Sequence, residues 1–388
     1  MNSSSLVFTG DIGFDRYMDG MWDDPQLLSK DVLDFLHSGN HVIANVEGPL
    51  VDQATNTTKE GVQQLLHTMN PLAVKVLNEM KADIWNICNN HMMDAGELGV
   101  ESTIAKAREN GACTIGAGMN LKEASSPMFL DGAGGIGLVS VGYRRGCKPA
   151  ADDHAGCFLW NEMELIEERI KEIKAKCRWC VVVAHGGEEF TSLPSPYTRD
   201  RYMEYLKMGA DVVVSHHPHV PMNYELVDNG SKAIFYSLGN FIFDTDYQRA
   251  QFNTEKGILL KLNFTEQEWS FEAMGLLIDR SNEHVVKAEL PKIFEDVQPD
   301  QYELLAPLSA KAFVAATKRQ QIYLNKAEFE HASDEKWAEH FANPKRSGRV
   351  EGEGLDFFII LPLAAKADEG RWKQSHLEAV KEFILEQM

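Results

Sequence analysis

The sequence predicts an α/β protein in which a largely parallel sheet carries helices on its faces. Two features of the chain lead to this fold class. Short apolar runs rich in β-branched or aromatic residues recur along the chain, and each run is too short to be a helix. Segments with helical periodicity lie between the runs, and this alternation is typical of parallel strands that are joined by helices.

The predicted strands share one property: each ends next to a residue that could bind a metal ion or a substrate. We expect strands at residues 6–10, 42–46, 84–88, 180–184 and 211–214. In chain order they lead into Asp11, Glu47, Asn89-Asn90-His91, His185 and the segment 215–219, which reads Ser-His-His-Pro-His. Ligands of open α/β sheets bind beyond the carboxyl ends of the strands. These side chains are therefore expected to converge, although they are far apart in the sequence.

Helices are predicted between these strands, and hairpins after them. The helical segments are residues 26–37, 71–80, 99–110, 161–176 and 199–208. Beyond the histidine cluster the period changes, which predicts one hairpin of 222–227 with 233–243 around Asp228-Asn229-Gly230, and another of 256–264 with 269–278. A weaker hairpin is predicted at 128–143, with its turn at 132–135.

The chain of 388 residues exceeds the usual length of one domain, and its last part carries no cluster of candidate ligands. We expect one domain over residues 1–290 and a C-terminal extension of unknown role over residues 291–388. The extension is predicted to be mostly helical, with helices at 302–311, 326–341 and 374–388, a strand-like run at 356–363 and an exposed loop at 343–354.

Composition and charge argue against several classes of function. The hydrophobic and charged fractions, 44% and 25%, are ordinary for a globular protein. A formal net charge of −20 repels nucleic acid and anionic lipid. No apolar run reaches the ~20 residues of a membrane span, and no early segment has the pattern of a signal peptide. We therefore expect a soluble, cytoplasmic protein without a nucleic-acid partner or a membrane span.

The six cysteines are expected to be free thiols. A chain of this length does not need disulfides for stability. The lone pair Cys177-x-x-Cys180 lacks the further ligands that a closed zinc site requires.

The residues at the strand ends offer carboxylate, amide and imidazole groups, which are ligands of divalent cations. On an extended segment His217 and His219 point to the same side. A carboxylate such as Asp11 or Glu47 can bridge two cations about 3.5–4 Å apart, as in two-metal hydrolases. Each residue also has a plainer interpretation, as part of a surface histidine tract, as a helix cap at Asn90 or as a turn carboxylate.

Six motifs in order, between about residues 5 and 265, resemble the CapA family of poly-γ-glutamate capsule-synthesis proteins. The motifs are Gly10-Asp11, Asn45-x-Glu47-Gly48-Pro49, Asn89-Asn90-His91-x-x-Asp94-x-Gly96, His185-Gly-Gly-Glu-Glu189, His216-His217-Pro218-His219-Val220 and Ser237-Leu238-Gly239-Asn240-Phe241. The family is built on the calcineurin-like metallophosphoesterase fold. The resemblance therefore implies a four-layer α-β-β-α sandwich over residues 1–290, with a site for two divalent metal ions (Mn, Fe or Zn).

The resemblance also implies a role for each motif residue. Asp11 and His219 would hold one metal ion, and Asn90, His185 and His217 the other. Glu47 stands where the superfamily usually has a bridging aspartate. His91 and Asp94, in the same motif, are the expected catalytic residues, and His91 would be the acid that protonates the leaving group. The expected substrate-binding or supporting residues are Asn45, Glu189, His216, Arg16, Arg199 and Asn240, and Arg201 is a further candidate phosphate or carboxylate clamp.

Two positions depart from the pattern of these relatives. The superfamily commonly has a histidine two residues after the first aspartate, where this chain has Gly13. In the CapA pattern a tryptophan commonly follows the histidine of the fourth motif, where this chain has Gly186.

Three functions are compatible with these expectations. The first is a metal-dependent hydrolase in which a metal-activated water attacks a γ-glutamyl amide or a phosphoester, in a small molecule or in a γ-glutamyl polymer. The second is a non-catalytic polymer-binding or scaffold protein of poly-γ-glutamate capsule biosynthesis. The third is a metal-stabilised protein without catalysis. The bond cleaved, the metal and the oligomeric state stay open.

Overall fold

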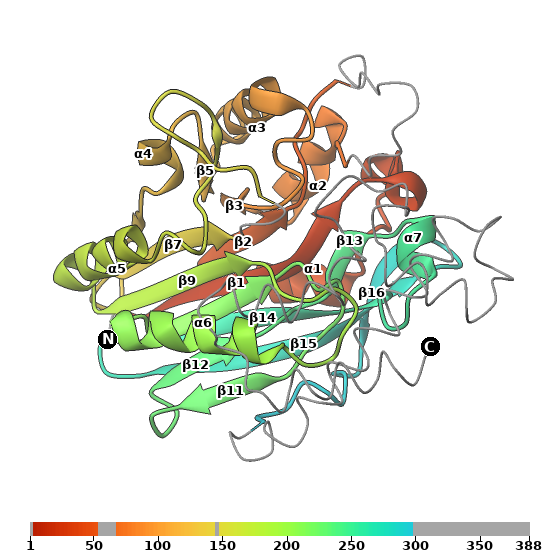
Figure 1. Cartoon of the computed structure of the whole chain (residues 1–388). Coiled ribbons are helices and arrows are strands. Elements are labelled where there is room, and N and C mark those ends of the chain that lie inside the picture. Colours follow the sequence, from red (N-terminus) through yellow and green to blue (C-terminus); the bar gives the residue numbers. More distant parts are fainter. Residues whose placement is uncertain (1–2, 53–66, 144–146, 298–388) are drawn as a thin grey trace, which may run out of the picture.

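The computed structural model describes residues 3–52, 67–143 and 147–297 (Figure 1). The predicted C-terminal elements at 302–311, 326–341, 356–363 and 374–388, and the loop at 343–354, lie outside these ranges.

The first of two large sheets has eight strands and carries most of the N-terminal motifs. Its order is β16-β15-β14-β1-β2-β3-β4, and β13 pairs with β1 beside this path. Strands β1 to β4 are parallel to one another, and β13 is parallel to β1, whereas β14 to β16 add an antiparallel edge. The bounds are β1 Ser4–Gly13, β2 His41–Val46, β3 Ile84–Asn86, β4 Cys113–Ile115, β13 Asn240–Phe243, β14 Lys256–Phe264, β15 Trp269–Asp279 and β16 His284–Ala288.

The second sheet has six strands in the order β11-β12-β10-β9-β7-β6. Its four inner strands are parallel, and each edge strand is antiparallel to its neighbour. The bounds are β6 Met128–Leu130, β7 Ile136–Gly142, β9 Trp179–His185, β10 Val212–His216, β11 Tyr224–Val227 and β12 Lys232–Phe235. Two short strands, β5 (Ala117–Gly118) and β8 (Gly156–Cys157), form a separate pair.

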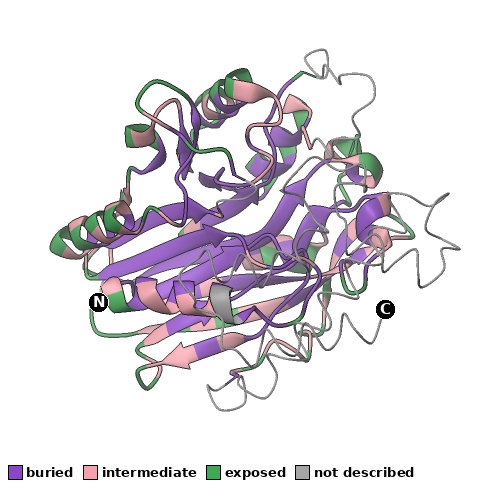
Figure 2. Ribbon diagram, in the orientation of Figure 1, coloured by how far each residue is buried: buried purple, intermediate pink, exposed green. Residues whose placement is uncertain are grey.

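The two sheets pack face to face around a shared apolar core. Phe8 and Ile43 from the first sheet meet Val181 and Val214 from the second in this core. Side chains that alternate along the same strands point to the outer faces, where helices cover them. Figure 2 shows both sheets as largely buried and the outward sides of the helices as exposed.

The outer faces of the two sheets are covered by different helices. The first sheet carries α1 (Lys30–Leu36), α2 (Val74–Glu79) and α3 (Gly96–Glu109), and the second carries α5 (Met163–Lys176) and α6 (Pro196–Met208). The shorter helices are α4 (Leu121–Ala124) and α7 (Asp246–Arg249). The predicted four-layer α-β-β-α sandwich is therefore confirmed.

The five predicted strands and the hairpins of β6 with β7, β11 with β12 and β14 with β15 are confirmed, but the prediction of one continuous strand at 233–243 is wrong. That segment is two strands in different sheets, β12 and β13. Gly239 lies between them with φ +68°, and an added Cβ would lie 2.7 Å from the carbonyl oxygen of Lys256. The chain turns here and crosses from one sheet to the other, which brings Asn240 beside Asp11 in β1.

Within the described part of the chain, none of the helices has the length and apolar character needed to cross a bilayer. All six cysteines are present as free thiols.

The start of β2 contains a histidine that should make stability depend on pH. His41 Nδ1 lies 2.7 Å from Asp83 Oδ2, and this hydrogen bond raises the pKa of His41. Because the folded-state pKa exceeds the unfolded value of about 6.5, the stabilisation is complete below that pH and is lost as the pH rises through the folded pKa. We expect His41→Gln to lower the urea midpoint more at pH 5.5 than at pH 9.

The exposed His154 offers a matched control, since its side chain is 48% exposed. His154→Gln should change the midpoint little at either pH. An equal loss at pH 5.5 and pH 9 in His41→Gln would show that the ion pair does not contribute.

Candidate metal centre

The ends of four parallel strands bring the predicted ligand residues to one buried place. Asp11 lies near the end of β1, Glu47 directly follows β2, and His185 and His216 are the last residues of β9 and β10. His185 and His216 are direct neighbours in the strand register. Asp11, Glu47 and His185 are completely buried. The convergence expected from the alternation of strands and helices is therefore present.

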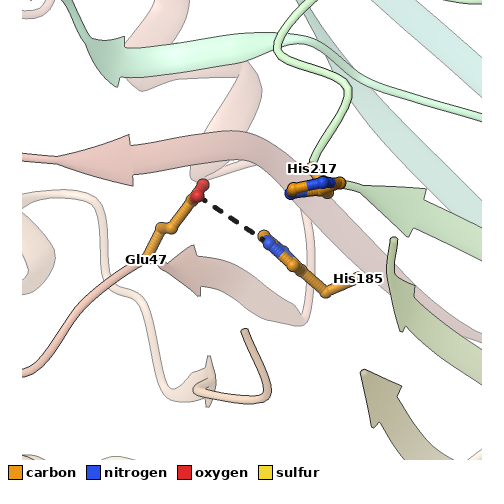
Figure 3. Close-up of side chains that lie close together, drawn as sticks. All are labelled: Glu47, His185 and His217. Atoms are coloured by element: carbon orange, nitrogen blue, oxygen red, sulfur yellow. Dashed lines mark ion pairs between the residues drawn. The ribbon is translucent and has the colours of Figure 1, made fainter. Parts of the chain in front are cut away.

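Three overlapping groups of side chains lie close enough to hold a cation. Within each group the ligand atoms lie within 4.8 Å of one another, and the groups are Glu47-His185-His217, Asp11-Glu47-His219 and Glu189-His217-His219. Figure 3 shows the first group, in which Glu47 and His185 point toward each other beside the ring of His217. Glu47 Oε1 lies 3.8 Å from His185 Nε2 and 3.6 Å from His219 Nε2. Glu47 thus stands between two histidines that belong to different groups.

Several polar atoms of this cluster have no hydrogen-bond partner among the described residues, and a divalent cation would satisfy them. Among the described residues, neither carboxylate oxygen of Glu47 has a hydrogen-bond partner, and nor does Nδ1 of His185 or of His217. Burial raises the pKa of Glu47 well above its usual range, although His219 acts in the opposite direction. Burying a carboxylate without a partner is costly, and a cation removes that cost. Oxygen and imidazole donors without a thiolate suit Mn, Fe or Zn.

Asn90 joins the cluster through His185. Its Oδ1 lies 2.8 Å from His185 Nε2, so the amide oxygen faces the same space as the imidazole. The side chain is partly buried and follows β3 in the chain. The ring of His185 also lies 5.0 Å from the ring of His217, so His185 is the neighbour that Asn90 and His217 share.

Burial and neighbouring charges give these histidines different protonation states. Burial lowers the pKa of His185 and of His217 well below the usual value, and nearby histidines add to the effect. Both are therefore neutral near pH 7, which is the form that ligates metal. Burial also lowers the pKa of His219, but the carboxylates of Glu47 and Asp11 outweigh it and raise the pKa to about 10. Metal binding at His219 would therefore displace a proton.

A chain of hydrogen bonds holds Asp11 from behind. Asn45 donates from Nδ2 to Asp11 Oδ1 at 2.8 Å, and Asn86 donates from Nδ2 to Asn45 Oδ1 at 2.7 Å. The hydroxyl of Ser140, on β7 of the other sheet, donates to Asn86 Oδ1 at 2.6 Å. Asn45 was expected as a supporting residue, whereas Asn86 and Ser140 were missed. The only local signal was a polar amide inside the apolar run at 84–88.

Asn240 orients His219. Its Nδ2 donates to Gln248 Oε1 at 3.1 Å and to the carbonyl oxygen of Thr254 at 2.9 Å. The amide oxygen of Asn240 therefore faces His219 Nδ1, at 2.9 Å. Nδ1 of His219 also lies 3.1 Å from Asp11 Oδ2. The other ring nitrogen of His219, Nε2, faces Glu47. Such a contact behind a ligand sets its tautomer and orientation.

His91 and Asp94 form a pair at the edge of the cluster. His91 Nδ1 lies 2.7 Å from Asp94 Oδ2. Burial lowers the pKa of His91, and the adjacent His67 lowers it further. His67 was missed in the sequence, because it lies outside every motif and every predicted strand.

The other expected binding residues differ in their position. Glu189, a member of the third group, has its Oε1 3.8 Å from His217 Nε2, and His216 borders the cluster with its Nδ1 3.8 Å from Asp11 Oδ1. Arg16 follows β1 and pairs through Nε with Asp246 at 2.8 Å, with 61% of its side chain exposed.

Two of the proposed arginine clamps contact other parts of the fold. Arg199 donates to both carboxylate oxygens of Glu225, at 2.6 and 2.8 Å. Arg201 is buried and donates to the carbonyl oxygen of Trp160 at 2.9 Å. We therefore assign both arginines to the packing of α6.

Aromatic rings fill the two positions that depart from the relatives. A Cβ on Gly13 would lie 2.5 Å from the ring of Phe243, and one on Gly186 would lie 2.6 Å from Tyr143 and 2.7 Å from Trp160. A larger residue at either position would collide with these rings. The absence of a side chain at Gly13 and Gly186 therefore leaves room for the neighbouring aromatic residues.

The four-layer fold brings these carboxylate, amide and imidazole groups together at the ends of its strands. The sequence profile of the family described as "Bacterial capsule synthesis protein PGA_cap" matches residues 5–245. The chain therefore belongs to this family of capsule-synthesis-related proteins.

Two curated relatives and two solved structures are similar to the chain. It is 30% identical over 265 residues to the PGA biosynthesis protein CapA of Bacillus subtilis (strain 168), covering 67% of this chain and 69% of the relative. It is 26% identical over 255 residues to the capsule biosynthesis protein CapA of Bacillus anthracis, covering 64% of this chain and 61% of the relative.

Both solved structures are 14% identical to the chain. A hypothetical protein from Thermus thermophilus has a TM-score of 0.41 and covers 74% of this chain and 100% of its own. A novel phosphatase from Mycoplasma pneumoniae has a TM-score of 0.45 and covers 71% of this chain and 94% of its own.

Proposed function

We propose that the protein is a metal-dependent hydrolase with a dinuclear centre. One observation carries the proposal: Glu47 is completely buried, neither of its carboxylate oxygens has a hydrogen-bond partner among the described residues, and it stands between His185 and His219. A shared carboxylate in this position is the arrangement that holds two cations close together. Nδ1 of His185 and Nδ1 of His217 are further buried polar atoms without a hydrogen-bond partner among the described residues.

The ligands divide into two sets around Glu47. Asp11 and His219 would hold one cation, and Asn90, His185 and His217 the other. When bound, two divalent cations acidify a water molecule and neutralise the negative charge that develops on the reacting group. Asn45 and Asn240 hold Asp11 and His219 in place, so that the ligands are arranged before any cation arrives.

In this proposal His91, in its protonated form, donates a proton to the leaving group. The contact of its Nδ1 with Asp94 orients the ring and leaves Nε2 for the substrate. A departing amine or alcohol needs this proton, because neither leaves readily as an anion.

The substrate class follows from the family and from the chemistry of the site. The PGA biosynthesis protein among the relatives favours a γ-glutamyl amide, in a polymer or a small molecule. The metallophosphoesterase-like fold is equally compatible with a phosphoester. Arg16, exposed after β1, could contact a carboxylate or phosphate of either substrate.

Loss of a ligand should lower the metal content. We expect about two metal ions per chain in the wild type after loading with Mn, Fe or Zn, and about one in His217→Ala or Asn90→Ala, measured by elemental analysis. The exposed side chains of His154 and Asn110 provide controls, and His154→Ala and Asn110→Ala should keep the wild-type content. Wild-type metal content in both ligand variants would refute the assignment.

A polymer-binding or scaffold protein of capsule biosynthesis is the second candidate. The names of both curated relatives concern biosynthesis, and this favours a role without bond cleavage. The two candidate functions are distinguished by whether the protein cleaves a substrate. The hydrolase cleaves p-nitrophenyl phosphate or γ-glutamyl-p-nitroanilide when metal is present, whereas the scaffold binds poly-γ-glutamate and cleaves neither.

A further inference from the structure

We propose that His67, held by Asp15, is a second catalytic imidazole that contacts the leaving group beside His91. The inference rests on the proposed hydrolase function and adds a residue to it. It is drawn from five contacts of His67, each with a different neighbour.

The rings of His67 and His91 are in direct contact. Their centroids are 4.1 Å apart, and the planes meet edge to face at 82°. The side chains are partly open, with exposed fractions of 13% for His67 and 15% for His91. A substrate group that reaches one imidazole is therefore close to the other.

Each of these imidazoles has its own carboxylate. Nδ1 of His67 contacts Asp15 Oδ2, as Nδ1 of His91 contacts Asp94 Oδ2. Asp94 Oδ2 also accepts the backbone N–H of His67 at 2.8 Å, so one carboxylate positions both histidines. With Nδ1 engaged on both rings, Nε2 is the atom on each that is left for a substrate.

His67 also lies next to the metal ligands. The ring of Phe243 is 5.1 Å from the ring of His67 and 4.9 Å from that of His219, so it stands between them. A Cβ on Gly48, the residue after Glu47, would lie 2.4 Å from the carbonyl oxygen of His67. The two imidazoles therefore border the place where the reacting bond would lie.

The pair provides both proton transfers that hydrolysis requires. Water adds its oxygen to the acyl carbon or the phosphorus, and the bond to the leaving nitrogen or oxygen breaks. The leaving atom takes the bonding electron pair together with a proton from the imidazole pair. The attacking water then gives one of its protons to the imidazole pair, which returns to its starting protonation state. One imidazole can act as the acid while its neighbour stays neutral and orients the leaving atom.

A series of leaving groups tests this role in the full metal-loaded chain. A good leaving group needs no proton, so the loss of a proton donor matters most for a poor one. We expect His67→Gln to lower kcat about 100-fold for phenyl phosphate or γ-glutamylanilide, and by less than about 10-fold for the p-nitro forms of the same substrates. Asp15→Asn should show the same selectivity with a smaller loss. His154→Gln is the control and should match the wild type.

The outcomes separate a proton donor from a structural residue. Unchanged kcat in His67→Gln, or equal losses for the good and the poor leaving group, would overturn the proposal. Metal content and thermal midpoint of the variant, compared with the wild type, show whether it has folded.

If the hydrolase proposal itself is wrong, the wild-type protein will cleave none of these substrates. The contact is then tested by ¹⁵N NMR of the histidine-labelled chain titrated with inorganic phosphate. Shifts of Nε2 at both His67 and His91 support the paired site, and a shift at His91 alone overturns it.

Discussion

Replacing Glu47 with glutamine should reduce turnover by about 10³-fold and remove most of the bound metal. The amide has nearly the same shape as the carboxylate but no negative charge, so it cannot hold two cations close together. Losing a charge at that position removes several kcal/mol of transition-state stabilisation, and about 4 kcal/mol corresponds to 10³-fold in rate. Steady-state kinetics and elemental analysis measure the two effects.

The same substitution should separate the stability of the fold from the stability added by metal. A ligand that binds only the folded state stabilises it by about 2.7 kcal/mol when present at 100 times its Kd. The thermal midpoint of the wild type should therefore fall when a chelator is added. Glu47→Gln should show almost no change with chelator, because the metal-dependent part is already absent.

A second buried glutamate provides the control for Glu47. Glu188 accepts the backbone N–H of Ser195 at 2.9 Å and the hydroxyl of Thr198 at 3.0 Å, at the start of α6. Glu188→Gln should lower stability with or without metal and should keep the response to chelator. Full metal content and a normal chelator response in Glu47→Gln would refute the shared-carboxylate arrangement.

Removing the ring of Phe8 is expected to destabilise the protein by about 3–5 kcal/mol. Phe8 is completely buried on β1, beside Ile43 of β2 and Leu260 of β14 in the register, and it belongs to the core between the sheets. Phe8→Ala leaves a cavity that the surrounding core side chains fill only in part. Urea unfolding followed by circular dichroism gives the free energy.

Two further substitutions show whether the loss comes from the cavity. Phe8→Leu keeps most of the volume and should cost less than about 2 kcal/mol. Leu98 on α3 is 67% exposed, and Leu98→Ala should change stability by no more than about 0.5 kcal/mol. A Phe8→Ala loss as small as that of Leu98→Ala would mean that the sheets do not share a tightly packed core.

The strands and the polar residues at their ends were predictable because both depend on short stretches of sequence. A buried parallel strand must be apolar throughout, so runs such as 180–184 stand out. A polar residue directly after such a run must lie at the carboxyl end of a strand, where ligands gather. This reasoning found Asp11, Glu47 and His185, which the structure places within one cluster.

The tertiary structure decided which polar groups meet and which do not. His67, Asp15 and Ser140 lie in segments with no local pattern that marks them, and only the packing of loops and of the second sheet brings them to the site. Arg199 follows a motif in the chain, yet its helix directs it to Glu225.

One physical cause separates the features that the sequence predicts from those that only the tertiary structure decides. Strand identity and the residue at a strand end follow from interactions between near neighbours in the chain, which the order of residues determines directly. The crossing at Gly239, the hydrogen bonds behind Asp11 and the contact of His67 with His91 join residues far apart in the chain. Such contacts depend on how the two sheets and their loops pack, which no short stretch of the sequence determines.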